Sequence, residues 1–355
     1  FDQLGEGALV IMSSAPEVLR NGDVHFPYRQ YSDVLYLTDC AEPNTHCLMH
    51  RTSGTLHRTM ACPEQDAQQA QWTGAWTTSD EACQRYGVEQ AVNVEAWADC
   101  VKQALRSADT VWLMSSEDEG LFKAAYPEWK GPIKQLDAVI QSLRIIKDPV
   151  EQHRMRTAAS ISAQAHREIM QMCQSDWTEA HVEGAFFASG RRRGADALAY
   201  PTIAAGGSNA CVLHYTANNA VLDPQGLVLL DAGMECSGYA ADITRTFPVS
   251  GRFSDVQRGL YEVVLSAQTA AIEAVKPGVT WQQLEHLTQQ ILIGGLIDLG
   301  VVSGSVVQCL EQKVLQAFYP HRLGHHLGLD VHDVPLQQSS TAAFEEGQVI
   351  TIEPG

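Results

Sequence analysis

Five polar residues toward the end of the chain belong to the residue types that bind hydrated divalent metals: Asp231, Asp242, His325, His332 and Glu353. Carboxylate oxygens with one or two imidazoles make up the ligand set of such a site. The five residues come from three separate segments, LLDAGMECSGYAADITRTF, HRLGHHLGLDVHD and ITIEPG, which the fold has to bring together. The pattern therefore indicates metal-assisted hydrolysis.

The three carboxylates differ in how strongly they point to a site. Asp231 ends an apolar run and begins Asp-Ala-Gly, which is also a common turn. Asp242 lies inside a β-prone run, where an unpaired carboxylate would be costly. Glu353 lies in a strand-like run, where an unpaired carboxylate would be costly in the same way. Pairing of the runs that carry Asp231 and Asp242 would turn both carboxylates into one pocket.

The histidines are individually ambiguous. His325 and His326 are neighbours whose side chains point in different directions, so we expect only one of them to be a ligand. His332 follows seven residues after His325, and His214 lies in the run Leu-His-Tyr-Thr. Each of these could also be a satisfied histidine outside any site. It is the set, rather than any single residue, that predicts the chemistry.

The elements expected around these residues are helices and antiparallel strands. The runs 227–231 and 239–247 predict two paired strands. N-cap residues followed by Glu or Gln three positions later predict helix starts at Asp148, Ser254 and Thr280. A further helix is expected over 178–193. We therefore predict that residues 145–355 form an α+β domain with a mostly antiparallel sheet.

The first part of the chain predicts a separate domain, because 355 residues exceed what one hydrophobic core usually spans. Strands are expected over 8–12, 34–37, 47–49 and 110–114, and a helix over 95–106. This alternation predicts an α/β domain over residues 1–144.

Composition excludes several classes of partner. The formal net charge of −18 is spread along the chain without a clustered basic patch, so nucleic acid is not expected as a partner. The nine cysteines are scattered and form no CxxC pair, which indicates reduced thiols and a cytoplasmic protein. No apolar run is long enough for a membrane span, so no membrane association is expected.

The chain resembles the Xaa-Pro aminopeptidases (aminopeptidase P), the proline-specific branch of the pita-bread metallopeptidases, over nearly its whole length. PYRQYSDVLYLT is similar to that family's N-terminal domain, and LHYT, DAGMECSGYAADITRTFPV, GHHLGLDVHDV and TIEPG are similar to its active-site segments. The resemblance implies a creatinase-like N-terminal α/β domain followed by a pita-bread catalytic domain. It also implies a homo-oligomer, either a dimer or a tetramer.

The resemblance implies roles for single residues. Metal ligands would be Asp231, Asp242, His325 and Glu353, with Asp242 bridging two ions. Two Mn²⁺ ions are expected, with Co²⁺ or Zn²⁺ also compatible with the ligands. Glu353 would help to deprotonate the attacking water, while His214 and His332 would act on the peptide. His321 would help to form the pocket for the proline ring, and Tyr200 would support the ligand shell.

The implied activity is hydrolysis of the Xaa-Pro bond, which releases the first residue of a peptide whose second residue is proline. A prolidase, which cleaves Xaa-Pro dipeptides, is the nearest alternative, although no residue for the dipeptide carboxylate is evident. Methionine aminopeptidases usually lack such a first domain, and creatinase-type enzymes lack the metals. A non-catalytic pita-bread binding protein remains a further alternative.

The family pattern includes one more bridging Glu, preceded by an Arg, that would follow Gly355. Because the sequence begins at Phe1, not Met, and ends at Gly355 after a strand-like run, we expect it to be a fragment at both ends, with the catalytic domain truncated at its C-terminus. If the chain instead ends at Gly355, we expect this polypeptide to bind metal weakly and to have an incomplete sheet. A metal titration that reveals two tight sites on it would contradict this expectation.

Overall fold

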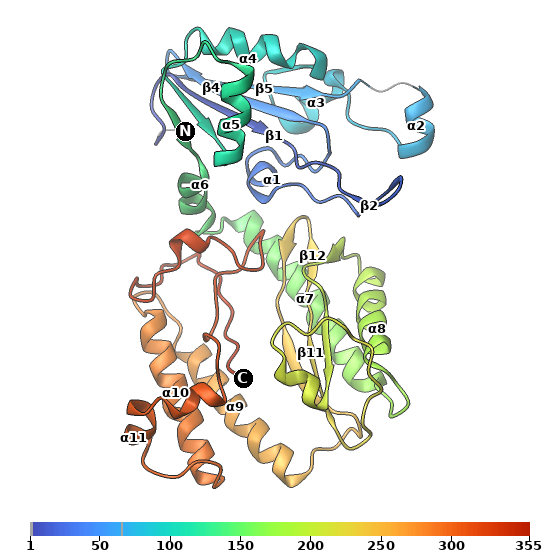
Figure 1. Cartoon of the computed structure of the whole chain (residues 1–355), viewed down its shortest axis with the longest axis vertical. Coiled ribbons are helices and arrows are strands. Elements are labelled where there is room, and N and C mark those ends of the chain that lie inside the picture. The colour runs from blue at the N-terminus through green and yellow to red at the C-terminus, as the bar shows by residue number, and fades with distance from the viewer. Residues whose placement is uncertain (1–2, 65–66) are drawn as a thin grey trace. The chain divides into compact units, whose positions relative to one another are not determined.

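The computed structural model describes residues 3–64 and 67–355 and divides the chain into two compact units, Phe1–Ile140 and Gln141–Gly355 (Figure 1). The division falls within helix α6 (Asp137–Arg144), a little before the boundary expected at residue 145. The expectation of a fragment rested partly on Phe1, and this residue lies outside the described residues.

The first unit contains one mixed six-stranded sheet in the order β6-β5-β4-β1-β7-β8. Its strands are β1 (Ala8–Ser13), β4 (His46–Thr52), β5 (Thr55–Cys62), β6 (Gln90–Asn93), β7 (Thr110–Leu113) and β8 (Ile133–Gln135). A separate hairpin joins β2 (Leu19–Asn21) to β3 (Val24–His25). The helices are α1 (Ser32–Thr38), α2 (Ala67–Thr73), α3 (Ser79–Tyr86), α4 (Trp97–Leu105), α5 (Ser116–Ala125) and α6.

Strand β1 lies in the middle of this sheet and is buried on both faces, because helices pack on each side of the sheet. It pairs with β4 antiparallel and with β7 parallel. Successive side chains of a strand point to opposite faces, so Leu9 packs toward α4 and α5 while Val10 packs toward α1 and α6. This three-layer arrangement agrees with the predicted α/β class.

Residues 34–37, expected as a strand, lie instead in helix α1. Short apolar runs do not distinguish a strand from a buried helix segment. The helix buries Val34, Leu35 and Thr38, which lie on one side of a helix, and Asp39 ends it in the left-handed conformation. The helical spacing of these buried positions shows why the prediction was wrong.

The second unit consists of helices packed on two small antiparallel sheets, in the orders β10-β11-β14 and β13-β12-β9. The strands are β9 (Ala197–Leu198), β10 (Ile203–Gly206), β11 (Leu227–Asp231), β12 (Met234–Cys236), β13 (Tyr239–Ala240) and β14 (Thr244–Pro248). The helices are α7 (Pro149–Met172), α8 (Glu179–Arg192), α9 (Asp255–Ala274), α10 (Trp281–Asp298) and α11 (Val306–Glu311). The α+β class is confirmed.

Helix starts in this unit follow the predicted caps. Asp148, Ser254 and Thr280 each form a capping box with the residue three positions later. The buried stripe of α7 and α8 packs with β11 and β12 around Ile169, Phe186 and Leu230. Helices α9 and α10 form a second core, seen beside each other in Figure 1.

The expected single strand over 239–247 is two strands in two different sheets. Tyr239–Ala240 pairs with β12, whereas Thr244–Pro248 pairs with β11. Asp242 therefore lies where the chain crosses from one sheet to the other, and not within a strand. Among the described residues, no helix combines the length and apolar character needed to cross a membrane.

Candidate metal centre

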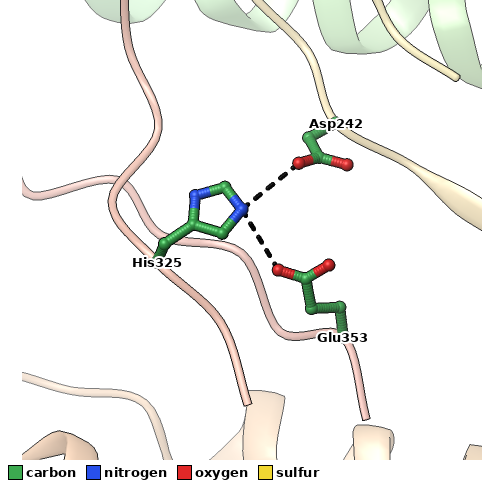
Figure 2. Close-up of side chains that lie close together, drawn as sticks. All are labelled: Asp242, His325 and Glu353. Atoms are coloured by element: carbon green, nitrogen blue, oxygen red, sulfur yellow. Dashed lines mark ion pairs between the residues drawn. The ribbon is translucent and has the colours of Figure 1, made fainter. Parts of the chain in front are cut away.

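Donor atoms from Asp242, His325 and Glu353 converge on one point in the second unit (Figure 2). His325 Nε2 lies 3.3 Å from Asp242 Oδ2 and 3.1 Å from Glu353 Oε1. The donor atoms of all three lie within 4.8 Å of one another. One histidine and two carboxylates thus present a mixed nitrogen and oxygen set.

Backbone pairing between two segments places His325 and Glu353 side by side. Thr351 N donates to His325 O at 2.9 Å, and Glu353 N donates to Leu323 O at 2.8 Å. The two segments form one isolated β-bridge, between His326 and Ile350. The strand-like run around Glu353 is therefore paired without forming a regular strand. Gly324 is required here because a Cβ at this position would lie 2.2 Å from Thr351 O.

Thr351, which the sequence did not single out, orients Glu353. Its hydroxyl donates to Glu353 Oε1 at 2.8 Å and also accepts from His325 N at 3.0 Å. One hydroxyl thereby links the backbone of one candidate ligand to the carboxylate of another. Thr351 lies two residues before Glu353, so both side chains point to the same side of an extended chain. This spacing could have identified Thr351 from the sequence.

The imidazole of His325 is held in one orientation. Its Nδ1 lies 2.9 Å from the carbonyl oxygen of His326, so Nδ1 carries the hydrogen and Nε2 faces the carboxylates. Burial lowers the pKa of His325, but hydrogen bonds to Asp242 and Glu353 outweigh it and raise the pKa to about 10. His326 is buried and packs against Trp281, so only one of the neighbouring histidines faces the carboxylates.

Asp231 joins this group through Tyr200. The Tyr200 hydroxyl donates to Asp231 Oδ1 and, at 3.0 Å, to Asp242 Oδ1. The segments that carry the two aspartates lie in close contact, because a Cβ on Gly233 would overlap the carbonyl oxygen of Ala241. Burial and the negative charge of Asp242 raise the pKa of Asp231 to about 7.

The electrostatics of this group fit a bound cation. Three carboxylates gathered in a partly buried space repel one another and lose hydration, as the raised pKa of Asp231 records. A divalent ion between them would remove both penalties. Asp231, Asp242, His325 and Glu353 are the residues that could hold it.

Three further histidines were predicted as site residues, and one of them, His332, contacts this group. The ring of His332 contacts that of His325, with centroids 4.4 Å apart. Burial and the charges of His325 and His214 lower the pKa of His332, and His214 itself is exposed. His321 packs against Tyr319, and its Nδ1 lies 2.9 Å from Arg322 O.

A buried ionic cluster that the sequence did not reveal anchors the segment next to His332. Asp333 accepts hydrogen bonds from Arg144 and, at 2.9 Å, from Lys147. The side chains of Asp333 and Lys147 are each only 1% exposed. Gly328 leaves room for the Asp333 carboxylate, because a Cβ there would lie 2.4 Å from it.

Comparison with known proteins identifies two matching families. Residues 153–355 match metallopeptidase family M24, and residues 1–112 match the N-terminal domain of aminopeptidase P. The Xaa-Pro aminopeptidase of Escherichia coli K12 is 34% identical over 369 residues, which cover 100% of this chain and 84% of that protein. The Xaa-Pro aminopeptidase of Haemophilus influenzae is 36% identical, with 100% and 83% covered.

Solved structures of aminopeptidase P are also similar to this chain. Zinc-substituted aminopeptidase P of E. coli in complex with product matches with a TM-score of 0.95 and 32% identity, covering 99% of this chain and 83% of that one. Proline aminopeptidase P II of Yersinia pestis matches with a TM-score of 0.95 and 31% identity, covering 99% and 84%.

Proposed function

Because this chain belongs to metallopeptidase family M24, within its Xaa-Pro aminopeptidases, and is a metal-dependent aminopeptidase, we propose that it hydrolyses the bond between the first residue of a peptide and a following proline. The observation that carries this proposal is the convergence of Asp242, His325 and Glu353 beside the Tyr200-linked Asp231. The group offers the ligands of a divalent-metal site, and the exposed His332 lies against one of them, His325.

We propose Asp231, Asp242, His325 and Glu353 as ligands of two divalent ions, with Mn²⁺ favoured by the oxygen-rich set. When bound, such ions supply a water nucleophile at neutral pH and polarise the scissile carbonyl. Glu353 would take up the proton of the attacking water, since its carboxylate points toward the other two labelled side chains in Figure 2. Tyr200 holds the two aspartates in place by donating to both.

The histidines act on the peptide in this proposal. His332 lies against His325 and is exposed, so it can reach a substrate bound next to the carboxylates. With its lowered pKa it is neutral at pH 7 and can donate a hydrogen bond to the developing oxyanion. His214 contributes a second exposed imidazole to the peptide.

Proline at the second position sets the specificity. An Xaa-Pro bond has no amide hydrogen and carries a rigid ring, so a pocket shaped for the ring can select it. We assign His321 to that pocket, as its ring is fixed against Tyr319. We further propose that residues 1–144 and 145–355 are the functional domains, that the protein is a cytoplasmic homo-oligomer, and that it binds neither nucleic acid nor membranes.

The test is a comparison of two substrates with the purified protein and added manganese. Release of the first residue is measured from an Xaa-Pro-Yaa tripeptide and from an Xaa-Pro dipeptide. Metal-dependent cleavage of the tripeptide alone is the expected result. Cleavage mainly of the dipeptide would move the protein to the prolidases and overturn the proposed specificity.

The matched control for this assay is Asp242→Asn, which keeps the size of the side chain and removes its charge. We expect this variant to lose at least about 100-fold in kcat/KM, because a proposed metal ligand loses its charge and one of its two oxygens. Activity that survives the change would argue against Asp242 as a ligand while leaving the family unaffected.

A further inference from the structure

A fully buried carboxylate lies outside the candidate metal centre and has no part in the proposed chemistry. Glu179, the first residue of α8, is 0% exposed. Its Oε1 accepts from Gly206 N at 2.8 Å and from Asn209 Nδ2 at 2.9 Å. Its Oε2 accepts from Tyr215 OH at 2.8 Å and from Ala220 N at 2.9 Å.

All four partners are donors, which requires an ionised carboxylate. Burial raises the pKa of Glu179, but the four hydrogen bonds outweigh this effect and lower the pKa below its usual value. The N-terminal end of α8 also favours negative charge at this position. Glu179 therefore remains a charged, four-fold acceptor at neutral pH.

The four donors share one loop, residues 206–220, which carries His214 at an exposed position. Gly206 and Ala220 are its two ends, and Tyr215 directly follows His214. Val212 and Leu213 are 55% and 53% exposed, so burial of their side chains does not hold the loop next to His214. The bonds to Glu179 close the loop at both ends and fix it beside the histidine.

We propose that Glu179 is a positioning residue for the peptidase reaction: it acts through the 206–220 loop to hold His214 where the peptide binds. This inference rests on the proposed function, in which His214 contacts the substrate. Glu179 itself touches neither substrate nor metal in this assignment. Its contribution is to reduce the freedom of the loop before the substrate arrives.

The substitution Glu179→Gln distinguishes the role of Glu179 as a hydrogen-bond acceptor from the filling of its buried position by a side chain of this size. Glutamine has nearly the same shape, but one of its two acceptor positions becomes an NH₂ group that faces two former donors. Tyr215 OH can turn to accept, whereas the Gly206 and Ala220 amides cannot. Either orientation of the glutamine therefore leaves one loop end without its acceptor.

The experiment is a double-mutant cycle on kcat/KM with the Xaa-Pro-Yaa tripeptide and saturating manganese, using Glu179→Gln, His214→Ala and the double variant. We expect Glu179→Gln to lower kcat/KM about tenfold and His214→Ala to lower it at least as much. The double variant should match His214→Ala within about twofold, because the effect of Glu179 passes through His214. The same parameter, kcat or KM, should change in both single variants.

The control is Glu183→Gln, one turn later in α8. Glu183 accepts one bond, from Asn218 Nδ2 at 3.1 Å, which a glutamine oxygen can also accept. Its kcat/KM should stay within about twofold of the parent. Should Glu179→Gln fail to fold, Tyr215→Phe enters the same cycle, with an expected loss of about threefold. It removes the donor to Glu179 Oε2 and also the oxygen that accepts from Asn209 Nδ2 at 3.0 Å.

The outcomes are distinct. If the losses from Glu179→Gln and His214→Ala multiply in the double variant, Glu179 does not act through His214 and the inference is overturned, while the proposed function stands. If His214→Ala leaves kcat/KM unchanged, the role of His214 in the proposed function fails and the inference fails with it. A Glu183→Gln loss as large as that of Glu179→Gln would reduce the effect to lost charge, which also overturns it.

Discussion

Tyr200 couples two of the proposed ligands through one hydroxyl, which makes it the sharpest single-residue test of the candidate centre. Tyr200→Phe removes the donor to Asp231 and Asp242 while keeping the ring. We expect manganese affinity to fall about 10- to 100-fold, as is usual when a group that orients metal ligands is lost. Titration with manganese at fixed pH measures the change, and unaltered affinity would show that the aspartates need no such support.

His166 gives a pH dependence that can be separated from catalysis. Burial lowers the pKa of His166 to about 4, and its Nε2 lies 2.9 Å from Ala232 O. The unfolded chain takes up a proton near pH 6.5, whereas the folded protein does so only near pH 4. The free energy of unfolding should therefore be unaffected by this group above pH 6.5 and fall by about 3 kcal/mol between pH 6.5 and 4.

The matched variant is His166→Gln, which keeps a donor for Ala232 O but does not titrate. Urea unfolding of both proteins between pH 7.5 and 4 should show a shallower loss in the variant. His326, whose pKa is also lowered to about 4, contributes the same loss to both proteins. Parallel curves would mean that His166 does not titrate differently in the folded and unfolded states.

At the residue scale, the sequence predicted the residues that converge, and the family resemblance pointed to Tyr200, but the other residues that orient the site were not predicted. Asp242 and Glu353 stand out because a charge in a β-prone or strand-like run is costly unless paired, whereas His325 is informative only as a member of the set. Thr351, Glu179 and Lys147 give no such signal, since Thr, Glu and Lys are common at strand ends, helix starts and surfaces. Their importance arises from contacts with residues far away in the sequence.

At the scale of elements, the close pairing of residues 323–325 with 351–353 holds two proposed ligands together. Gly324→Ala would place a Cβ 2.2 Å from Thr351 O, so the two segments must separate. We expect this variant to lose metal binding and to be destabilised by about 1–3 kcal/mol. Metal content after dialysis and urea unfolding measure the two effects.

The same substitution at Gly294 in α10 is the control. A Cβ there meets nothing within 4 Å. Alanine also favours a helix interior by about 1 kcal/mol over glycine, so Gly294→Ala should be neutral or stabilising and keep its metal. Equal behaviour of the two variants would show that Gly324 is not needed for close approach.

Helices with an explicit start signal and the strand over 227–231 were predicted well, whereas the change of sheet within the run 239–247 was not. The caps at Asp148, Ser254 and Thr280 fix helix starts locally. The run 239–247 contains no local mark of its change from one sheet to the other at Asp242. That change depends on β11 and β12, and a β-prone run fits either sheet equally well.

At the scale of the whole molecule, each unit has its own hydrophobic cores, which is the basis for separate unfolding. One core of the first unit surrounds Val10 and another surrounds Leu9, while the second unit has cores around Leu230 and Ile293. The two-domain architecture and the resemblance to the Xaa-Pro aminopeptidases were both predicted from the sequence, and the comparisons confirm that family. The family could be predicted best because its motifs are spread along the whole chain.

All proposed metal ligands lie in the second unit, so metal should stabilise only that unit. At free manganese about 100 times its Kd, binding adds about 2.7 kcal/mol to the free energy of unfolding, or roughly 5–10 °C in Tm for a unit of this size. Scanning calorimetry with manganese and with a chelator should therefore show one transition that moves and one that stays. Asp242→Asn should abolish the movement, because the charge of a proposed metal ligand is lost. A single transition that moves as a whole would instead mean that the two units unfold as one.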